Sequence, residues 1–253
     1  MFTLAIVRQP ARSIVHGLTT AALGPPDYSR AVGQHAAYVS ALQNCGLKVL
    51  TLAADENLPD SVFVEDTALL TPHCAVIANP GAPSRKGEIA AMLPVIEDNF
   101  KVIEFIRPPG TLEPGDVMMA GSHFFIGLSK RTNAAGAAQL ISILEKYDMT
   151  GSTIKLEKML HLKTGVSYLE HNNLVACGEF IDHPDFKHFN ILPVDDDEAY
   201  AANCLWINDS VLVAAGFPKT SRKIKDAGYK VIELEMSEFQ KVDGGLSCLS
   251  LRW

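Results

Sequence analysis

The last eleven residues, Asp243-Gly-Gly-Leu-Ser-Cys-Leu-Ser-Leu-Arg-Trp253, carry more information about the fold than any other part of the chain. They place Cys248 in an apolar, strand-like run directly after two glycines, which lack the Cβ that would keep a ligand or other backbone at a distance. A cysteine in such a position is either a small, inert core residue or a nucleophile. Histidine and carboxylates that are distant in sequence but meet it in space would indicate a nucleophile.

Upstream of this stretch, the chain repeats a unit of roughly forty to fifty residues. In each unit a polar head is followed by a strand, a turn, a second strand, a helix and a returning strand. The first unit begins at Val62 with the strand VFVEDTALLT and has its helix at 84–98, and the second begins at Leu112 and has its helix within 132–146. The third begins at His161, and its helix is poor or missing because Asp182-His-Pro-Asp185 interrupts the pattern. The fourth begins with AANCLWIND at 201–209 and has its helix at 218–227.

The fifth unit is divided between the two ends of the chain. Residues 243–253 would pair with the strand TLAIVR at 3–8, and a helix over 29–44 and a strand over 48–52 would complete the unit. A unit shared in this way commonly closes a ring. The alternation predicts an α/β protein in which residues 1–253 form a single domain. The polar heads should then meet near one central axis, in a pocket containing Glu65 and Asp66, Glu113 and Asp116, His161 and Cys248.

Composition and charge limit the function classes. The 253 residues are 47% hydrophobic and 20% charged, and the net charge is −7, with basic residues spread along the chain. Nucleic acid and membrane are therefore not expected as partners, and no apolar run is long enough to cross a bilayer. The five cysteines have no CxxC spacing, and the N-terminus reads as a first strand and not as a signal peptide. These features predict a reduced, cytoplasmic protein.

Several segments together resemble the dimethylarginine dimethylaminohydrolases, members of the superfamily of enzymes that modify guanidino groups. The matching segments are SVFVEDTALL, EPGDVMM, RTNAAGA, LEKMLHLKTGVSYLEHNNLVA, YAANCLWIND and DGGLSCLSLRW. The resemblance implies a five-bladed, pseudo-symmetric α/β propeller with a central pocket. It also implies hydrolysis of Nω-methylated arginines to citrulline and a methylamine, without a cofactor.

The resemblance assigns three catalytic residues. Cys248 would attack the guanidinium carbon and form a covalent thiouronium, while the other cysteines lie inside helix or strand patterns and are expected to be inert. His161 would be the acid for the departing amine and then the base for water, although a histidine can also simply cap a strand end. Glu113 would hold and polarise His161; from spacing alone, Asp116 is an alternative for that role.

The resemblance also assigns the substrate-binding residues. Glu65 and Asp66 would contact the guanidinium, although in a regular strand their side chains would point to opposite faces. Asp60 would belong to the pocket, or else cap a loop. Arg85 and Arg131 would bind the substrate carboxylate. The carbonyl groups of Leu18 and Val242 would contact the α-amino group and the guanidino end.

Two further features bear on specificity. Arginine deiminases carry an acid two residues after the histidine, where this chain has Lys163. The missing carboxylate would leave room for methyl groups and favour methylated arginine. The loop at 17–27 is rich in Gly and Pro and is either a lid over the substrate or an ordinary surface loop.

The expected partner is a small-molecule substrate, and no functional metal is expected, although Cys248 and His161 together offer an adventitious zinc site. A homodimer is compatible with the sequence. Two alternatives stay open: an enzyme acting on another guanidino or ureido compound, and a non-catalytic propeller such as the ribosome anti-association factors, which share this fold.

Overall fold

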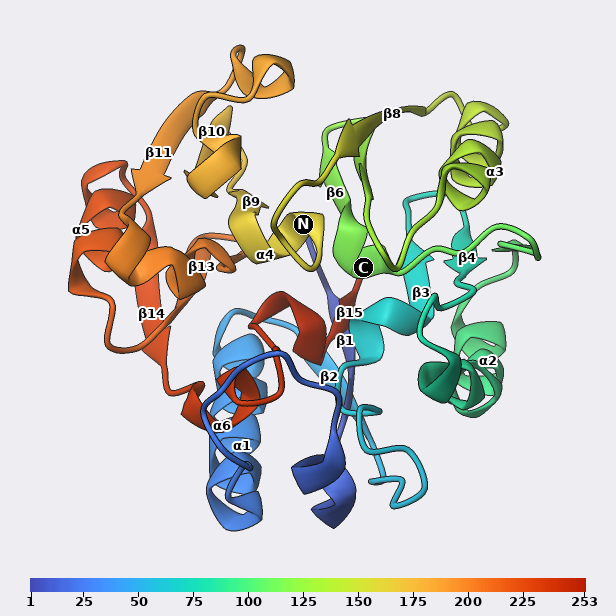
Figure 1. The fold of residues 1–253 in the computed structure, drawn as a ribbon, viewed down its shortest axis with the longest axis horizontal. Coiled ribbons are helices and arrows are strands. Elements are labelled where there is room, and N and C mark those ends of the chain that lie inside the picture. Colours follow the sequence, from blue (N-terminus) through green and yellow to red (C-terminus); the bar gives the residue numbers. More distant parts are fainter.

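The computed structural model describes residues 1–253 and contains five three-stranded sheets arranged around a central axis (Figure 1). In every sheet the first two strands are antiparallel and the third runs parallel to the second. This is the order strand, turn, strand, helix, returning strand that the sequence predicts. The predicted α/β propeller is confirmed.

The sheets are numbered here as blades in the order of the sequence repeats. Blade 1 is β3 (Ala68–Leu70), β4 (Ala75–Ile77) and β5 (Ile103–Phe105); blade 2 is β6 (Val117–Ala120), β7 (His123–Leu128) and β8 (Thr150–Lys155); blade 3 is β9 (Val166–Tyr168), β10 (Asn173–Cys177) and β11 (Asn190–Val194); blade 4 is β12 (Leu205–Ile207), β13 (Ser210–Ala214) and β14 (Lys230–Leu234); and blade 5 is β15 (Leu251–Arg252), β1 (Leu4–Arg8) and β2 (Lys48–Leu52).

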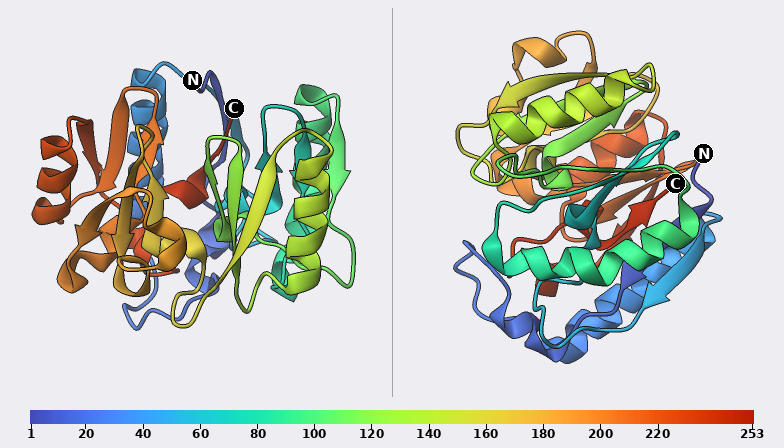
Figure 2. Two further views of the ribbon diagram at one scale, coloured as in Figure 1. Left: turned by 90° about the horizontal axis from the view of Figure 1, so that it is seen from above. Right: turned by 90° about the vertical axis from the view of Figure 1, so that its right-hand side faces the viewer.

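The longer helices lie on the outside of the ring (Figures 1 and 2). They are α1 (Tyr28–Asn44), α2 (Lys86–Asn99), α3 (Ala134–Glu145) and α5 (Pro218–Asp226). In two of them the residue before the helix caps it with its own side chain: the carboxylate of Asp27 accepts from the Arg30 amide at the start of α1, and Asn133 Oδ1 accepts from the Gly136 amide at the start of α3. Blade 3 has only the 3₁₀ turns η5 (Gly178–Phe180) and η6 (Pro184–Phe186) where the others have a helix, as the interrupted pattern predicts.

The middle strand of each blade is buried on both faces, which explains why these strands are continuous apolar runs. Alternate residues of one strand enter two different hydrophobic clusters. In β1, for example, Ala5 and Val7 pack toward blade 4, whereas Ile6 packs toward blade 1. The five clusters thus alternate with the five blades around the ring. The apolar cores lie between the blades, and the axis is left to polar side chains.

The two chain ends close the ring. β1 pairs antiparallel with β15, with Ala5 opposite Arg252, and parallel with β2, with Leu4 opposite Lys48. The termini lie side by side in all three views (Figures 1 and 2). The pairing of the first and last segments in one blade therefore agrees with the divided fifth unit.

Two local predictions are wrong, and both concern the polar heads. Cys248 lies in the 3₁₀ turn η8 (Ser247–Leu249) and not in a strand, and the strand expected from Val62 begins only at Ala68. In η8 the Ser247 amide donates to the Asn203 side chain and the Cys248 amide to the Gly245 carbonyl, so neither is available to a sheet. Before β3, the turn η2 (Val64–Thr67) replaces the predicted strand.

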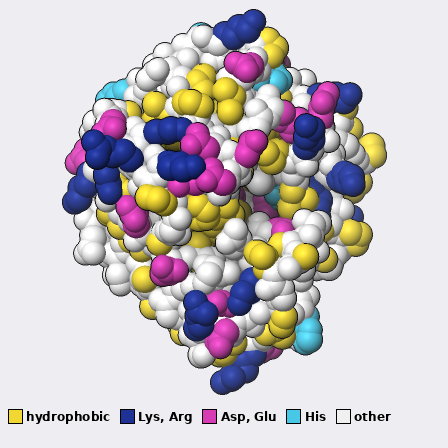
Figure 3. All heavy atoms as spheres, turned by 60° about the vertical axis from the view of Figure 1, so that its left-hand side comes forward, with side chains coloured by type: hydrophobic (Ala, Val, Ile, Leu, Met, Phe, Trp, Pro, Cys, Tyr) yellow, Lys and Arg dark blue, Asp and Glu magenta, His cyan; other side chains and the backbone are white.

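No helix combines the length and apolar character needed to cross a membrane. On the face shown in Figure 3, Lys and Arg side chains are interspersed with Asp and Glu.

Candidate active site

Short turns at the start of the blades carry the predicted site residues to the axis. These turns are η2 in blade 1, η4 (Pro114–Asp116) in blade 2, α4 (Leu162–Gly165) in blade 3 and η8 in blade 5. Glu113 and His161 are the residues immediately before η4 and α4. In each of these turns the backbone is no longer extended, and the turn comes just before the first strand of its blade. The side chains of the turn therefore face the axis instead of the space between blades.

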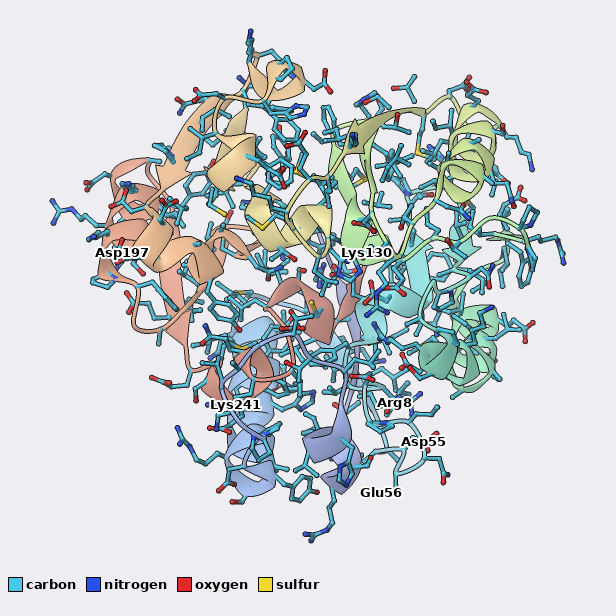
Figure 4. The ribbon with its side chains drawn as sticks, in the orientation of Figure 1. Arg8, Asp55, Glu56, Lys130, Asp197 and Lys241 are labelled. Atoms are coloured by element: carbon cyan, nitrogen blue, oxygen red, sulfur yellow. The ribbon has the colours of Figure 1, made fainter.

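All but one of the predicted residues line a single cavity of about 140 Å³: Leu18, Asp60, Asp66, Arg85, Glu113, Arg131, His161, Val242 and Cys248. The exception, Glu65, lines an adjoining cavity of about 300 Å³ that shares His161 and Cys248 with the first. Lys130 and Lys241, which precede Arg131 and Val242, are labelled in Figure 4; Lys130 lies on the segment after β7, and Lys241 on the segment that leads to η8. Residues up to 230 positions apart in the chain therefore meet at one point.

His161 is held by Glu113. The Nε2 of His161 lies 2.8 Å from Glu113 Oε2, and Glu113 is fully buried. The other Glu113 oxygen accepts from the Ala82 amide and lies 3.5 Å from Arg131 Nη1. Because Nε2 is bound to a carboxylate, Nδ1 is the ring nitrogen left to exchange a proton with a ligand.

Burial alone would lower the pKa of His161. The hydrogen bond to Glu113 and the charges of Asp66, Asp116 and Glu113 outweigh burial and raise this pKa to about 9. His161 is consequently an imidazolium at neutral pH, able to donate a proton.

Asp116 does not hold the imidazole ring. Its carboxylate instead accepts from the Leu162 amide at 3.0 Å and from the Ser129 hydroxyl at 2.7 Å. Of the two carboxylates that the spacing allows as partners of the ring, Glu113 is the one that makes the contact.

Cys248 is partly exposed to the shared cavity, and its sulfur accepts from the Gly245 amide at 3.4 Å. Burial of the thiol and the nearby charges of Glu65 and Asp66 raise its pKa to about 12, against smaller opposing effects of Gly245 and Lys163. The thiol is therefore protonated at neutral pH, and a positive charge near the sulfur would favour the thiolate.

The two glycines before η8 are needed for close packing. A Cβ on Gly244 would clash with the Phe63 ring, and one on Gly245 would clash with the Asn203 side chain. The paired glycines predict a close approach at this point, and the groups that approach are these two side chains.

Asp66 and Arg85 form a buried ionic cluster with Glu88. Arg85 Nη1 donates to Asp66, Nε and Nη2 donate to Glu88 at 3.0 and 2.8 Å, and Nη2 also donates to the Phe63 carbonyl at 2.8 Å. Arg85 thus has one N–H, on Nη1, free for a ligand. Burial raises the pKa of Asp66, but the charges of Arg85 and His161 and the hydrogen bonds from Gly115 and Arg85 together outweigh burial and lower it, so Asp66 stays ionised.

Arg131 is less constrained than Arg85. Its guanidinium makes one ion pair, with Glu113, and its side chain is 21% exposed. Of the two predicted carboxylate-binding arginines, Arg131 therefore has the more donors available.

The loop at 17–27 lies against the site. Asp60 Oδ1 accepts from the Leu18 amide at 3.0 Å, and burial raises the pKa of Asp60. Thr19 Oγ1 donates to the Lys241 carbonyl at 2.8 Å, and both the amide and the hydroxyl of Thr20 donate to Asp243 Oδ2. These bonds tie the loop to the segment that leads to Cys248; movement of the loop as a lid stays a prediction.

Glu65 is already engaged. Its Oε1 accepts from Lys163 Nζ at 2.7 Å and lies 3.6 Å from Arg252 Nη2, while its Oε2 accepts from the Ser247 hydroxyl at 2.8 Å. Lys163 therefore does more than leave the place of an acid empty, because its ammonium group neutralises a carboxylate next to Cys248.

Sequence reasoning missed Asn203 and Ser247. The Asn203 amide group donates to the Lys163 carbonyl at 2.8 Å and to Ser247 Oγ at 3.1 Å, and its oxygen accepts from the Ser247 amide at 3.0 Å. Asn203 is the polar residue at the head of blade 4, the one unit for which no site residue was predicted. The repeat itself could have identified it.

One group of side chains has the composition of a metal site. Single ligand atoms of Asp66, Glu113 and His161 lie within 4.8 Å of one another. Each of them already has a partner, since Asp66 binds Arg85 and Glu113 binds His161.

A family model and a relative of known name both relate the chain to the dimethylarginine dimethylaminohydrolases. A family model described as N,N dimethylarginine dimethylhydrolase, eukaryotic, matches residues 27–249. The chain is 53% identical over 254 residues to an N(G),N(G)-dimethylarginine dimethylaminohydrolase of Pseudomonas aeruginosa, covering 100% of both chains.

Two solved structures superimpose on the structure of this chain with a TM-score of 0.99, each at 53% sequence identity and with 100% of both chains covered. One is a cysteine-to-serine variant of the Pseudomonas aeruginosa enzyme complexed with citrulline. The other is a histidine-to-glycine variant of a dimethylarginine dimethylaminohydrolase in an adduct with S-methyl-L-thiocitrulline. The resemblance inferred from the sequence motifs is confirmed.

Proposed function

The chain belongs to the dimethylarginine dimethylaminohydrolase family, and on that premise we propose that it hydrolyses Nω-methylated L-arginines to L-citrulline and mono- or dimethylamine. The observation that supports this most directly is a single cavity that holds a cysteine, an imidazolium and a partly free arginine. These groups match what the reaction requires: a nucleophile, a proton donor for the amine and a partner for the substrate carboxylate.

The first half of the reaction forms a covalent intermediate. The guanidinium of the substrate brings positive charge to Cys248, which favours loss of the thiol proton to solvent. The sulfur attacks the guanidinium carbon, and His161 Nδ1 protonates the methylated nitrogen as its bond to that carbon breaks. The amine leaves, and a thiouronium remains on Cys248.

The second half releases citrulline. His161, now neutral, removes a proton from water as the oxygen attacks the thiouronium carbon. The carbon–sulfur bond then breaks with its electron pair passing to the sulfur, the remaining hydroxyl proton is transferred to that thiolate, and the new C–O group becomes the ureido carbonyl. Throughout, Glu113 keeps Nε2 of His161 protonated and fixes the orientation of the ring.

The remaining predicted residues would bind the substrate. Arg131, with the single free N–H of Arg85, would hold the carboxylate. The carbonyl groups of Leu18 and Val242 would contact the α-amino group and the guanidino end, and Asp60 would belong to the same pocket. Asp66 would orient the guanidinium. Glu65 would contact the guanidinium through the lone pairs that Lys163 and Ser247 leave free on its oxygens.

We also propose that residues 1–253 form one domain and act in the cytoplasm, with no cofactor, functional metal, nucleic acid or membrane partner. Assembly as a homodimer belongs with these proposals and is tested by light scattering. The main alternative is an enzyme for another guanidino or ureido compound, and the second is a non-catalytic propeller.

The decisive assay is incubation with asymmetric dimethylarginine, followed by measurement of citrulline and dimethylamine. Arginine, agmatine and citrulline serve as comparison substrates. Equimolar citrulline and dimethylamine support the proposal. Turnover of only a comparison substrate supports the first alternative, and no turnover of any supports the second.

We expect Arg131→Ala to raise KM roughly tenfold with little change in kcat, because a carboxylate contact is made about equally in the ground and transition states. Steady-state kinetics on asymmetric dimethylarginine measures this. Agmatine analogues, which lack the carboxylate, provide the control and should respond little. Equal losses on both kinds of substrate would show that Arg131 is structural. Arg222→Ala on the outer helix α5 is a second control and should change neither KM nor kcat.

We expect Lys163→Asp to lower turnover of methylated arginine at least tenfold, because it removes the ion pair with Glu65 and places a second carboxylate beside the first. If the missing acid sets specificity, activity on arginine should rise relative to methylated arginine. Lys163→Met separates these effects, since it removes the charge without adding an acid. An unchanged substrate ratio in Lys163→Asp would move the discrimination to the cavity walls, and the loop at 17–27 would be examined next.

A further inference from the structure

Asp116 is a fully buried carboxylate that does not contact the reacting groups directly. Its Oδ1 accepts from the Leu162 amide, the residue after His161, at 3.0 Å, and its Oδ2 accepts from the Ser129 hydroxyl at 2.7 Å. No Lys or Arg lies within ion-pair distance of it. A buried carboxylate without such a partner costs stability, so its position calls for an explanation.

The Ser129 hydroxyl links Asp116 to the segment that carries Arg131. Its oxygen accepts from the Arg131 amide at 2.9 Å and from the Thr132 amide at 3.2 Å. Thr132, also fully buried, accepts at Oγ1 from the Glu113 amide at 3.1 Å. The backbone segments that carry Arg131, Glu113 and His161 are thus joined through one chain of hydrogen bonds.

We propose that Asp116 is a positioning residue that fixes the segment carrying Arg131 and the segment carrying His161 relative to each other. This rests on the proposed function, because it assumes that Arg131 holds the substrate and that His161 transfers the proton. The reacting carbon and the imidazole must be aligned within a fraction of an ångström, and a single anchor shared by both segments supplies that alignment.

The same carboxylate also acts on His161 through its charge. The groups that face His161 are the carboxylates of Glu113, Asp66 and Asp116, and all three favour the imidazolium. The groups that face Asp116 are His161 and the donors from Ser129, Thr132 and Leu162. Loss of the negative charge at Asp116 should therefore make His161 easier to deprotonate.

Two substitutions separate the two connections. Ser129→Ala weakens the link between Asp116 and the Arg131 segment, where the Thr132 donor remains, and leaves the Leu162 contact in place, so we expect KM to rise roughly threefold to tenfold with kcat nearly unchanged. Asp116→Asn weakens both connections and removes the charge, so we expect lower kcat, higher KM and a His161 pKa lower by about one unit or more.

The matched control is Glu198→Gln. Glu198 is also a buried carboxylate that accepts from backbone amides, those of Lys219 and Thr220, but it caps helix α5 on the outside of blade 4. Its substitution should cost comparable stability while leaving KM, kcat and the His161 titration unchanged.

The His161 pKa is read by NMR titration of the ¹⁵N-labelled imidazole in the substrate-free protein, which does not depend on any activity. Failure of the parent to act on asymmetric dimethylarginine would reject the proposed function and leave this titration informative. The positioning role is rejected if Asp116→Asn titrates like the parent, or if Ser129→Ala leaves KM unchanged. If Asp116→Asn does not fold, the Ser129→Ala kinetics alone decides, since that hydroxyl is only partly buried.

Discussion

Cys248→Ser is expected to lower turnover of asymmetric dimethylarginine by about 10⁴-fold or more, with binding retained. A serine hydroxyl has a much higher pKa than a thiol, and no residue of the cavity is placed to remove its proton, because His161 is already protonated. Citrulline formation gives the rate, and calorimetric titration with substrate gives the affinity.

The matched control is Cys45→Ser. Cys45 is also only partly buried, but it lies at the end of α1 on the outside of the ring. It should leave kcat and KM unchanged. Substantial citrulline production by Cys248→Ser would remove Cys248 from the mechanism, whereas loss of both binding and turnover would indicate a misfolded site.

His161→Gly is expected to lower kcat by about 10²- to 10⁴-fold, the usual contribution of general acid–base catalysis. Because this variant lacks the base for water, any thiouronium that forms should persist on Cys248. Mass spectrometry of the quenched protein would detect it as a mass increase on the peptide containing Cys248, and Cys248→Ser incubated in the same way should show none.

The parent enzyme should show a matching pH dependence. The pKa of His161 is raised to about 9, so the proton donor is present below that pH and is lost as the pH rises through it. We expect kcat, which reports the substrate-bound enzyme in which the thiolate has formed, to fall on the basic side near pH 9. Glu113→Gln removes the main group that favours the imidazolium, so it should move this fall in rate to lower pH. An unchanged basic side of the profile would contradict the assignment of the fall to His161.

The pattern of the chain was enough to predict the ring. Each middle strand is buried on both faces, so it appears as an uninterrupted apolar run, and the turns and helices between these runs recur at a nearly constant spacing. The division of the fifth unit between residues 3–8 and 243–253 followed from the same repeat. The convergence of the polar heads then followed from the ring, because equivalent positions of successive units lie around one axis.

The conformation of the heads was not predicted correctly. Glu65, Asp66 and Cys248 were placed in strands, because the flanking residues are apolar and local pattern alone does not mark the residue at which a strand begins. All three lie in 3₁₀ turns; at Cys248 its own amide is bonded to the Gly245 carbonyl and the preceding Ser247 amide to the Asn203 side chain. The donor to Ser247 comes from blade 4, 44 residues earlier in the chain, and no short-range pattern reports it.

The sequence by itself determined the class, the ring and the identity of the chemical groups, because these depend on periodicity and on which residues stand at the heads of the units. Only the tertiary structure decided how those groups are used: that Glu113 and not Asp116 binds the His161 ring, that Lys163 neutralises Glu65, and that Arg85 has one free N–H whereas Arg131 has several. The physical reason is that protonation and hydrogen bonding depend on distances of about 3 Å between side chains. Residues far apart in the sequence reach those distances only after every blade is in place.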